Sequence, residues 1–316
     1  MKKKTFFTTS LRGEIAKRSG AISTKQSHAR TQEIASSKRT PVGRSLLLAM
    51  TVLCAIVSGC DQPIQSAYQE QINVASFIFA NEAIDSVVLH RTTPFGDYYD
   101  DLDYAVDSAI VIVTTNGVAD TLLPATLKGR YYLPASKLVV QGGQTYNLTI
   151  IALNEQTGGT HVLTAATTVP MPIHLDSIPP SFHGQTVTLD TTDLAAFAFL
   201  LTAGPVDESN REYLLSVTAL DTNVGRIHNG GDSSTNRVRY SNIATGPEIA
   251  ITSRFFTWYG PNLITFYAID TNFADYQRQL SGGGNYQPTL NHINGGIGVF
   301  GSAARDTVSI VVMPKQ

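Results

Sequence analysis

Beyond residue 70 the chain alternates short apolar runs with polar turns. Val, Ile, Thr, Tyr and Phe gather in the runs, and Gly, Asn, Asp and Pro separate them. Within residues 145–153, Tyr146, Leu148 and Ile150 alternate with polar residues, which is typical of a strand with one buried face. We therefore expect strands at residues 72–79, 86–91, 109–114, 121–122 with 129–132, 145–153, 161–169, 185–189, 197–201, 213–220, 238–240, 249–252, 263–269 and 307–312.

The spacing of these strands predicts an all-β fold whose first half is an immunoglobulin/fibronectin-like β-sandwich. The stretch LVVQGGQTYNLTI places a leucine, a Gly-containing turn and then Tyr146 at the start of a strand. It resembles the tyrosine corner of such sandwiches, in which the tyrosine hydroxyl bonds to upstream backbone. The alternative is that Tyr146 is an ordinary strand aromatic.

A Pro-rich stretch divides the predicted strands into two groups. Residues 167–184 hold four prolines, which break any strand that enters them, so we expect a linker at 171–184. The second group is β-rich with one short helix at 272–280. Asn272 is the expected N-cap, and Phe273, Tyr276 and Leu280 share one face. The tail from Ser281 is Gly-rich, and we expect no strand there until the last one.

An apolar run precedes this β-rich part. Residues 46–57 are nearly all apolar and follow Lys38, Arg39 and Arg44. The run is short for a membrane span, which needs roughly 20 apolar residues, and its layout is that of a secretory signal. The alternative is an ordinary signal or anchor helix that ends at a small apolar residue.

The run ends in Val57-Ser58-Gly59-Cys60. This order resembles the lipobox of bacterial lipoproteins. The resemblance implies that the Cys60 thiol receives a diacylglyceryl group, and that the amino group freed by cleavage receives a further acyl chain such as palmitate. Thioether formation requires the nucleophilic thiolate that cysteine supplies.

The organisation expected from these features has six segments. They are a basic leader at 1–44, a lipoprotein signal peptide at 45–59, a tether at 60–69, the sandwich at 70–170, the linker at 171–184 and a C-terminal β-rich domain at 185–316. The leader is either an unusually long and disordered start of the signal or sequence upstream of the true start codon. We favour the second.

The net charge of the chain limits the classes of molecule that it can bind. Residues 1–59 hold 11 of the 23 Lys and Arg but only 2 of the 25 Asp and Glu, so the rest of the chain has 12 basic and 23 acidic residues, a net charge of −11. An acidic protein is disfavoured as a ligand of nucleic acid or of anionic lipid headgroups. We therefore expect membrane contact through the lipid anchor and no nucleic-acid partner.

One acidic stretch and one aromatic stretch are candidates for ligand binding. DYYDDLDYAVD holds Asp97, Asp100, Asp101 and Asp103, which are weak calcium candidates because Ca²⁺ takes several oxygen ligands. The alternative is a solvated acidic loop, since the glycine and terminal glutamate of an EF-hand are missing. RFFTWYG offers Phe255, Trp258 and Tyr259 as weak binding candidates, which aromatic stacking would use. Their alternative is a place in the core.

Catalytic and cofactor motifs do not appear. The sequence has no HExxH, no GxSxG and no phosphate-binding loop. We expect no cofactor and no catalytic residue. Paired carboxylates of a carbohydrate-active enzyme stay a remote alternative, because their separation is not visible in sequence.

Several phrases resemble those of the lipoproteins of Bacteroidetes type that carry domain of unknown function 4249 (DUF4249). They are VDSAIVIVTTNG, GQTYNLTIIAL, ATTVPMPI, DESNREYLLSV, FYAIDTNFADYQRQL and HINGGIGVFGS. The basic leader departs from that family, and only Asp61 follows Cys60 as an acid. The resemblance implies an outer-membrane lipoprotein of the cell envelope, on either face, that works with a TonB-dependent receptor.

We therefore expect a non-enzymatic, lipid-anchored accessory or binding protein of a TonB-dependent transport system. The alternative is a structural or adhesive surface module, which would need no transporter. A carbohydrate-active enzyme is the third hypothesis, and it would require a polar cleft between the two β regions.

Overall fold

The computed structural model describes residues 68–94, 96–155, 157–175, 186–189, 198–204, 212–227, 236–281 and 291–314. Residues Glu70–Gln316 form one compact unit. Strands dominate it, and the described residues contain one α-helix, α3 (Thr271–Ser281). The predicted all-β fold with a short helix is confirmed.

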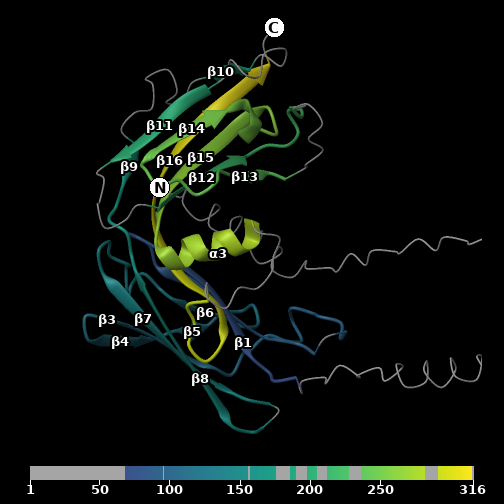
Figure 1. The fold of residues 1–316 in the computed structure, drawn as a ribbon, viewed down its shortest axis with the longest axis vertical. Coiled ribbons are helices and arrows are strands. Elements are labelled where there is room, and N and C mark those ends of the chain that lie inside the picture. The colour runs from purple at the N-terminus through teal and green to yellow at the C-terminus, as the bar shows by residue number, and fades with distance from the viewer. Residues whose placement is uncertain are drawn as a thin grey trace, which may run out of the picture. The chain divides into compact units, whose positions relative to one another are not determined.

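Two sheets form the first part of this unit (Figure 1). One runs in the order β1 (Ile72–Phe79), β2 (Ile84–Arg91), β6 (Arg130–Leu133), β5 (Leu123–Pro124), and the other in the order β4 (Val118–Thr121), β3 (Ile110–Thr115), β7 (Thr145–Leu153), β8 (Thr160–Thr168). This division, with the first two strands paired and the third and fourth in the opposite sheet, is that of an immunoglobulin-like sandwich.

The core lies between these sheets. Tyr146, Leu148 and Ile150 of β7 are buried, as their alternation predicts, and join the same apolar cluster as Val74 of β1 and Leu89 of β2. A strand that buries alternate residues against a second sheet is stable only in one register, because a slip of one residue would expose the whole buried set.

Tyr146 forms the predicted tyrosine corner. Its ring is buried, and its hydroxyl accepts the backbone N–H of Gln141 at 2.7 Å. The bond ties the start of β7 to the turn five residues upstream.

We expect Tyr146→Phe to lower the free energy of unfolding by about 1–2 kcal/mol, because it removes one hydrogen bond and leaves a backbone donor without its partner. Tyr98→Phe, at a side chain that is 85% exposed, should change stability by less than about 0.5 kcal/mol. Urea unfolding of both variants checks this, and equal stabilities would contradict it.

Two further sets of strands form the second part of the unit. A three-stranded sheet has the order β14 (Glu248–Thr252), β11 (Ala198–Gly204), β9 (His174–Leu175), and the other strands are β10 (Thr186–Leu189), β12 (Glu212–Ala219), β13 (Val238–Tyr240), β15 (Gly260–Ile269) and β16 (Ile297–Pro314). Leu215, Phe266 and Ile310 are buried between them and continue the core of the first part.

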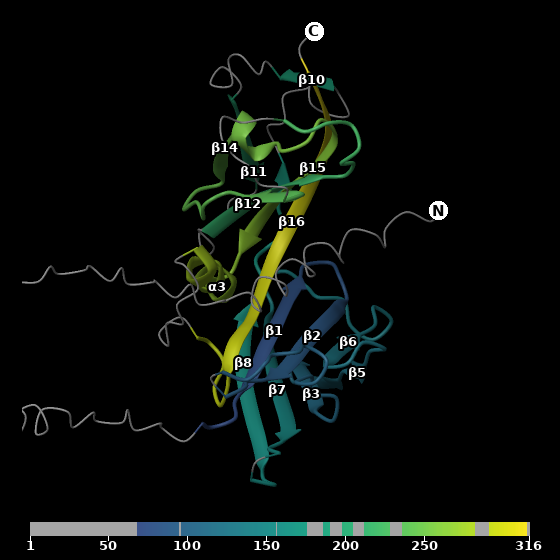
Figure 2. The same cartoon turned by 90° about the vertical axis from the view of Figure 1, so that its right-hand side faces the viewer.

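β16 belongs to both parts. Its first residues pair in parallel with β1, from Asn73 opposite Ile297 to Phe79 opposite Ala303. From Ala303 onward it pairs with β15 in antiparallel fashion, and its end pairs with β10. Figures 1 and 2 show it as one long arrow that runs from β1 to β15. A single nine-stranded sheet therefore passes through both parts.

Two expectations about strands need correction. The linker expected at 171–184 contains β9, which pairs with Ala203 and Gly204 of β11, and residues 176–185 lie outside the described residues. The last strand was expected at 307–312 but begins ten residues earlier, at Ile297. The part of β16 that pairs with β1 lies inside the Gly-rich tail, where the pattern of apolar residues predicts no strand.

Candidate functional site

A network of polar side chains surrounds the start of α3. Asp270 comes directly before the helix, and its Oδ1 accepts the backbone N–H of Phe273 at 3.0 Å, as an N-cap does. The same oxygen accepts the N–H of Ser302 on β16 at 2.8 Å. The prediction that Asn272 is the N-cap is wrong. Asn272 lies inside the helix, and its side-chain amide donates to carbonyls of two strands.

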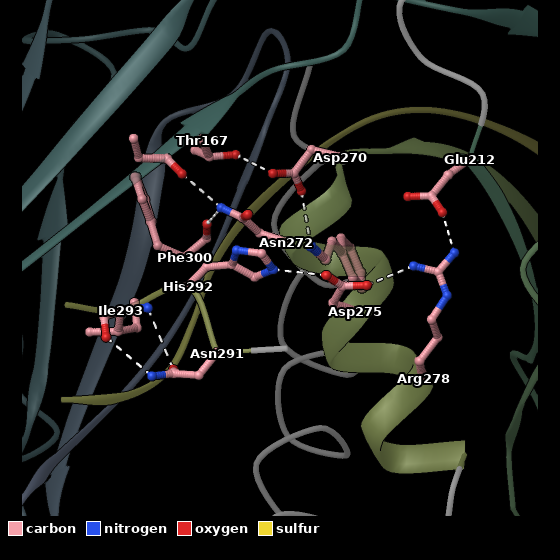
Figure 3. Close-up of polar contacts among 12 residues, drawn as sticks. Thr167, Glu212, Asp270, Asn272, Asp275, Arg278, Asn291, His292, Ile293 and Phe300 are labelled. Carbon is pink, nitrogen blue, oxygen red and sulfur yellow. Dashed lines mark hydrogen bonds and ion pairs between the residues drawn. The ribbon is translucent and has the colours of Figure 1, made fainter. Parts of the chain in front are cut away.

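Asn272 joins the two sheets of the sandwich (Figure 3). Its Nδ2 donates to the carbonyl of Ala166 on β8 at 2.7 Å and to that of Phe300 on β16 at 2.8 Å. β8 and β16 belong to different sheets and form no backbone ladder with each other. The buried amide therefore satisfies one carbonyl of each strand, which would otherwise face a dry interior.

Thr167 and Ser302 complete this junction. Thr167 Oγ1 lies 2.6 Å from Asp270 Oδ2 and 2.7 Å from Ser302 Oγ. Ser302 Oγ lies 3.1 Å from the carbonyl oxygen of Thr168 on β8. Burial raises the pKa of Asp270 above its usual value of 3.8, although the donors from Ser302, Thr167 and Phe273 favour its charged form and limit the shift.

This pKa shift predicts a pH dependence. The folded state favours protonated Asp270, so its contribution to the free energy of unfolding is complete below the unfolded pKa and is lost as pH rises through the raised folded pKa. We expect the stability of the native chain relative to Asp270→Asn to fall as pH rises from about 3.5 toward 7. Urea unfolding across this range measures it, with Asp103→Asn in an exposed loop as control. A constant difference would contradict it.

The outer part of the network is charged. Asp275 Oδ1 accepts from Arg278 Nη1 at 2.7 Å, and its Oδ2 lies 2.8 Å from His292 Nε2. Arg278 also bonds to Glu212 of β12, and this hydrogen bond is the main reason that the pKa of Arg278 is raised. The side chains of Arg278 and His292 are 42% and 31% exposed, whereas that of Asp275 is 12% exposed. This part of the network links α3 to β12 and to the segment before β16.

The apolar side of α3 packs on β1. The ring centroid of Phe77 lies 4.4 Å from that of Phe273 and 5.5 Å from that of Tyr276. Burial raises the pKa of Tyr276 to about 12. Phe273 and Tyr276 therefore share a packed face, as the helical period predicts.

The start of β16 and the segment before it are shaped by an asparagine and several glycines. Asn291 donates through Nδ2 to the carbonyls of Ile293 and Gly296 at 3.1 and 3.0 Å, and its Oδ1 accepts the N–H of Gly298 at 3.0 Å. A Cβ on Gly298 would lie 2.0 Å from the carbonyl oxygen of Val74, and one on Gly301 would lie 3.0 Å from Phe273. The phrase HINGGIGVFGS thus permits close backbone approach.

The chemistry of the network follows from these contacts. The hydrogen-bonding groups of Asp270, Asn272, Thr167 and Ser302 are directed at one another and at strand carbonyls. They close the open side of the sandwich between β8 and β16. Among His, Cys, Asp and Glu of the described part of the chain, no group of three or more is placed to hold a metal ion.

The calcium candidates are not gathered into a ligand set. Asp97, Asp101 and Asp103 are exposed, and Asp100 Oδ1 accepts the N–H of Leu102 at 2.8 Å within its own loop. Within the described part of the chain, these carboxylates do not form a group of three or more that could hold a metal ion. Burial and the neighbouring Asp101 raise the pKa of Tyr99 in this loop to about 12.

The aromatic candidates do not form an exposed platform. Phe255 and Tyr259 are half-buried and pack against the core. Trp258 is also half-buried, and its backbone forms an isolated antiparallel β-bridge with that of Arg226. Phe256, between them in sequence, is fully buried. The group therefore serves mainly as packing around the turn before β15.

The predicted lipobox, Val57, Ser58, Gly59 and Cys60, lies outside the described residues. Within the ranges described, no helix combines the length and the apolar character that crossing a bilayer requires.

Sequence patterning does not predict the α3 network of Asp270, Asp275, Arg278 and His292. One local signal is that Asp275 and Arg278 are three residues apart on one helix and so can form a pair. Asp directly before the helix was the available cue for the cap.

Comparison with known proteins gives the family but no activity. Residues 60–309 match the model of the domain of unknown function DUF4249. No curated protein matches significantly.

Among solved structures, the chicken CNTN1 FN1–FN3 domains are 11% identical with a TM-score of 0.26, over 77% of this chain and 66% of that one. A Parabacteroides merdae β-glucuronidase is 10% identical with a TM-score of 0.22, over 63% of this chain and 23% of that one. The chain thus spans less than two thirds of each. A two-domain fibronectin type III segment of chicken tenascin is 10% identical with a TM-score of 0.18, over 64% of this chain and 91% of that one.

TM-scores of this size support no inference about activity. The family match is different, because it spans most of the chain and includes every described strand from β1 to β15. This chain belongs to the DUF4249 family.

Proposed function

We propose that this protein is a lipid-anchored, non-enzymatic cell-envelope protein that serves as an accessory binding component of a TonB-dependent outer-membrane transport system. The observation that carries the anchor is Val57-Ser58-Gly59-Cys60 at the end of the apolar run at 46–57. A cysteine at the end of such a run, followed by a short polar segment and then a folded unit, is the layout of a tethered lipoprotein.

Two observations support this order of segments. The compact unit begins at Glu70, ten residues after Cys60, and the family match begins at Cys60 itself. Two or three acyl chains on that cysteine would hold the protein stably at a membrane, whereas one would bind only marginally.

The polar network of α3 gives no support to a catalytic site at that place. Its buried donors and acceptors are engaged in joining β8, β16 and the helix. A catalytic site would instead direct such groups at a substrate position.

Intact mass and N-terminal analysis of the membrane-extracted protein test the anchor. We expect the native chain to begin at an acylated Cys60, and Cys60→Ala to keep its leader. Ser66→Ala, in the expected tether, should be processed like the native chain. A native chain without lipid would contradict the proposal.

The transport role needs a separate test. We expect affinity capture from gently solubilised membranes of the native host to enrich a TonB-dependent receptor over an unrelated lipoprotein that carries the same tag. Equal recovery of receptors by both baits would contradict the accessory role and leave the anchor unaffected.

A further inference from the structure

The outward face of the sheet β4–β3–β7–β8 has an unusual composition. We call it the outer face, and it comprises residues 110, 112 and 114 of β3, 119 and 121 of β4, the odd-numbered residues 145–153 of β7 and the even-numbered residues 160–168 of β8. The burial pattern of β7 and β8 alternates cleanly, with these residues on the solvent side. At β8 the face adjoins the α3 network, which bonds to the backbone carbonyls of Ala166 and Thr168.

No residue of the outer face carries a charge, and none is aromatic. Threonine is its commonest residue, and the others are Ile, Leu, Val, Ala and one Asn. The chain from Cys60 onward has a net charge of −11, so an uncharged face spanning four strands stands out from the rest of the molecule.

Strand register arranges the face in rows. Ile110, Ile151 and Val162 lie side by side across three strands. The side chains of Ile110 and Val162 are 52% and 57% exposed. In the next row Thr149 lies between Ile112 and Thr164. Rows of β-branched side chains of similar length make a level surface, which is the kind that packs against a second sheet.

The composition limits the class of partner. Phosphate and nucleic acid require Arg or Lys, and stacking on sugar rings requires aromatic side chains. Neither occurs on the outer face. A level, uncharged protein surface fits it instead, because it leaves no charge buried without a partner.

A second copy of this chain supplies such a surface. Two molecules of net charge −11 repel each other, and a contact adds least to this repulsion where neither copy brings a charge. The outer face meets this condition for both copies at once, as a two-fold interface demands.

The available area suits a small interface. Strands of nine, nine, six and four residues, at about 3.3 Å per residue and about 4.8 Å between strands, give a flat area of roughly 450 Å² per copy. A pair would bury roughly 900 Å² before surface roughness is counted, which is typical of a weak, reversible contact.

We propose that the outer face is a homodimer interface, in which the sheets β4–β3–β7–β8 of two copies pack face to face. The contact goes beyond the accessory role and does not depend on the lipid anchor. It assigns the exposed aliphatic row of Ile110, Ile151 and Val162 to an apolar contact with the partner.

Thiol cross-linking of the full chain in intact cells tests the proposal. Asn147 is exposed on the central strand β7, so Asn147→Cys should give a product of twice the chain mass with a short bis-maleimide. Thr307→Cys, at an exposed threonine of β16 outside the face, is the matched control, and the chain without an added cysteine is the blank. We expect at least a fivefold excess of dimer for Asn147→Cys.

A second variant tests the specificity of the contact. Adding Val162→Lys to the Asn147→Cys chain places two like charges in the interface and should reduce the cross-link to the control level, whereas adding Thr307→Lys should leave it unchanged. A cross-link no stronger than that of Thr307→Cys, one that survives Val162→Lys, or a product with the mass of another protein would overturn the proposal. Thermal unfolding of the Lys variants shows that they remain folded.

Discussion

Gly298→Ala should destabilise the protein by at least about 3 kcal/mol, the largest effect that we expect from one added methyl group. Gly298 has a φ of +115°, and a Cβ there would lie 2.0 Å from the carbonyl oxygen of Val74 and 2.6 Å from Asn73 Oδ1. All of these atoms belong to the parallel pairing of β1 with β16. The methyl group therefore cannot be accommodated unless the two strands separate.

Gly117→Ala is the matched control. Gly117 follows Asn116 in the turn between β3 and β4, and both have positive φ, as a two-residue hairpin turn requires. A Cβ on Gly117 meets nothing within 4 Å, so Ala there should cost only the conformational strain of about 1–2 kcal/mol. Urea unfolding of both variants separates strain from collision. Equal losses of stability in the two variants would show that the close approach of β1 to β16 is not the reason that position 298 requires glycine.

Asn272→Ala should lower the free energy of unfolding by about 2–4 kcal/mol. The change leaves the buried carbonyls of Ala166 and Phe300 without a donor, and each unsatisfied buried group costs about 1–3 kcal/mol. Asn272→Asp should cost more, because it replaces the donor with a carboxylate that faces two carbonyl oxygens. Thr271→Ala, at the exposed neighbouring position, is the control and should cost less than about 1 kcal/mol.

Hydrogen exchange localises the effect of Asn272→Ala. The amides of Thr164 and Asn294 bond to each other's carbonyls where β8 meets the segment before β16. We expect them to lose protection in Asn272→Ala more than the amides of β12 and β15, which lie in the second part of the unit. Uniform loss of protection would show a general loss of stability and would contradict a local closing role for Asn272.

The sequence predicted most of the first sandwich because alternation is visible within a single strand. The boundaries of β1 and β7 agree with the expected ranges 72–79 and 145–153, and the helix was expected at 272–280 and found at Thr271–Ser281. Alternation depends only on residues that are close in sequence. It therefore predicts an element well where one face of that element is buried.

The first half of β16 was missed for a physical reason. Gly298 and Gly301 lower the strand propensity of this segment, yet close packing against Val74 and Phe273 requires them. The α3 network was missed because its contacts join distant segments. Thr167 and Asp270 are 103 residues apart, and Ala166 and Asn272 are 106 apart. No local pattern contains such pairings.

The double membership of β16 sets the order in which the fold can close. Asn73 pairs with Ile297, a separation of 224 residues, so the first sandwich lacks one of its strands until the C-terminal part of the chain reaches it. Contacts at such separations form slowly, and until then β1 has an open edge. A chain truncated before residue 297 would present that edge to proteases and to other chains. Only a chain that includes β16 can pair the open edge of β1, so a truncated chain keeps an exposed strand edge that the full-length protein lacks.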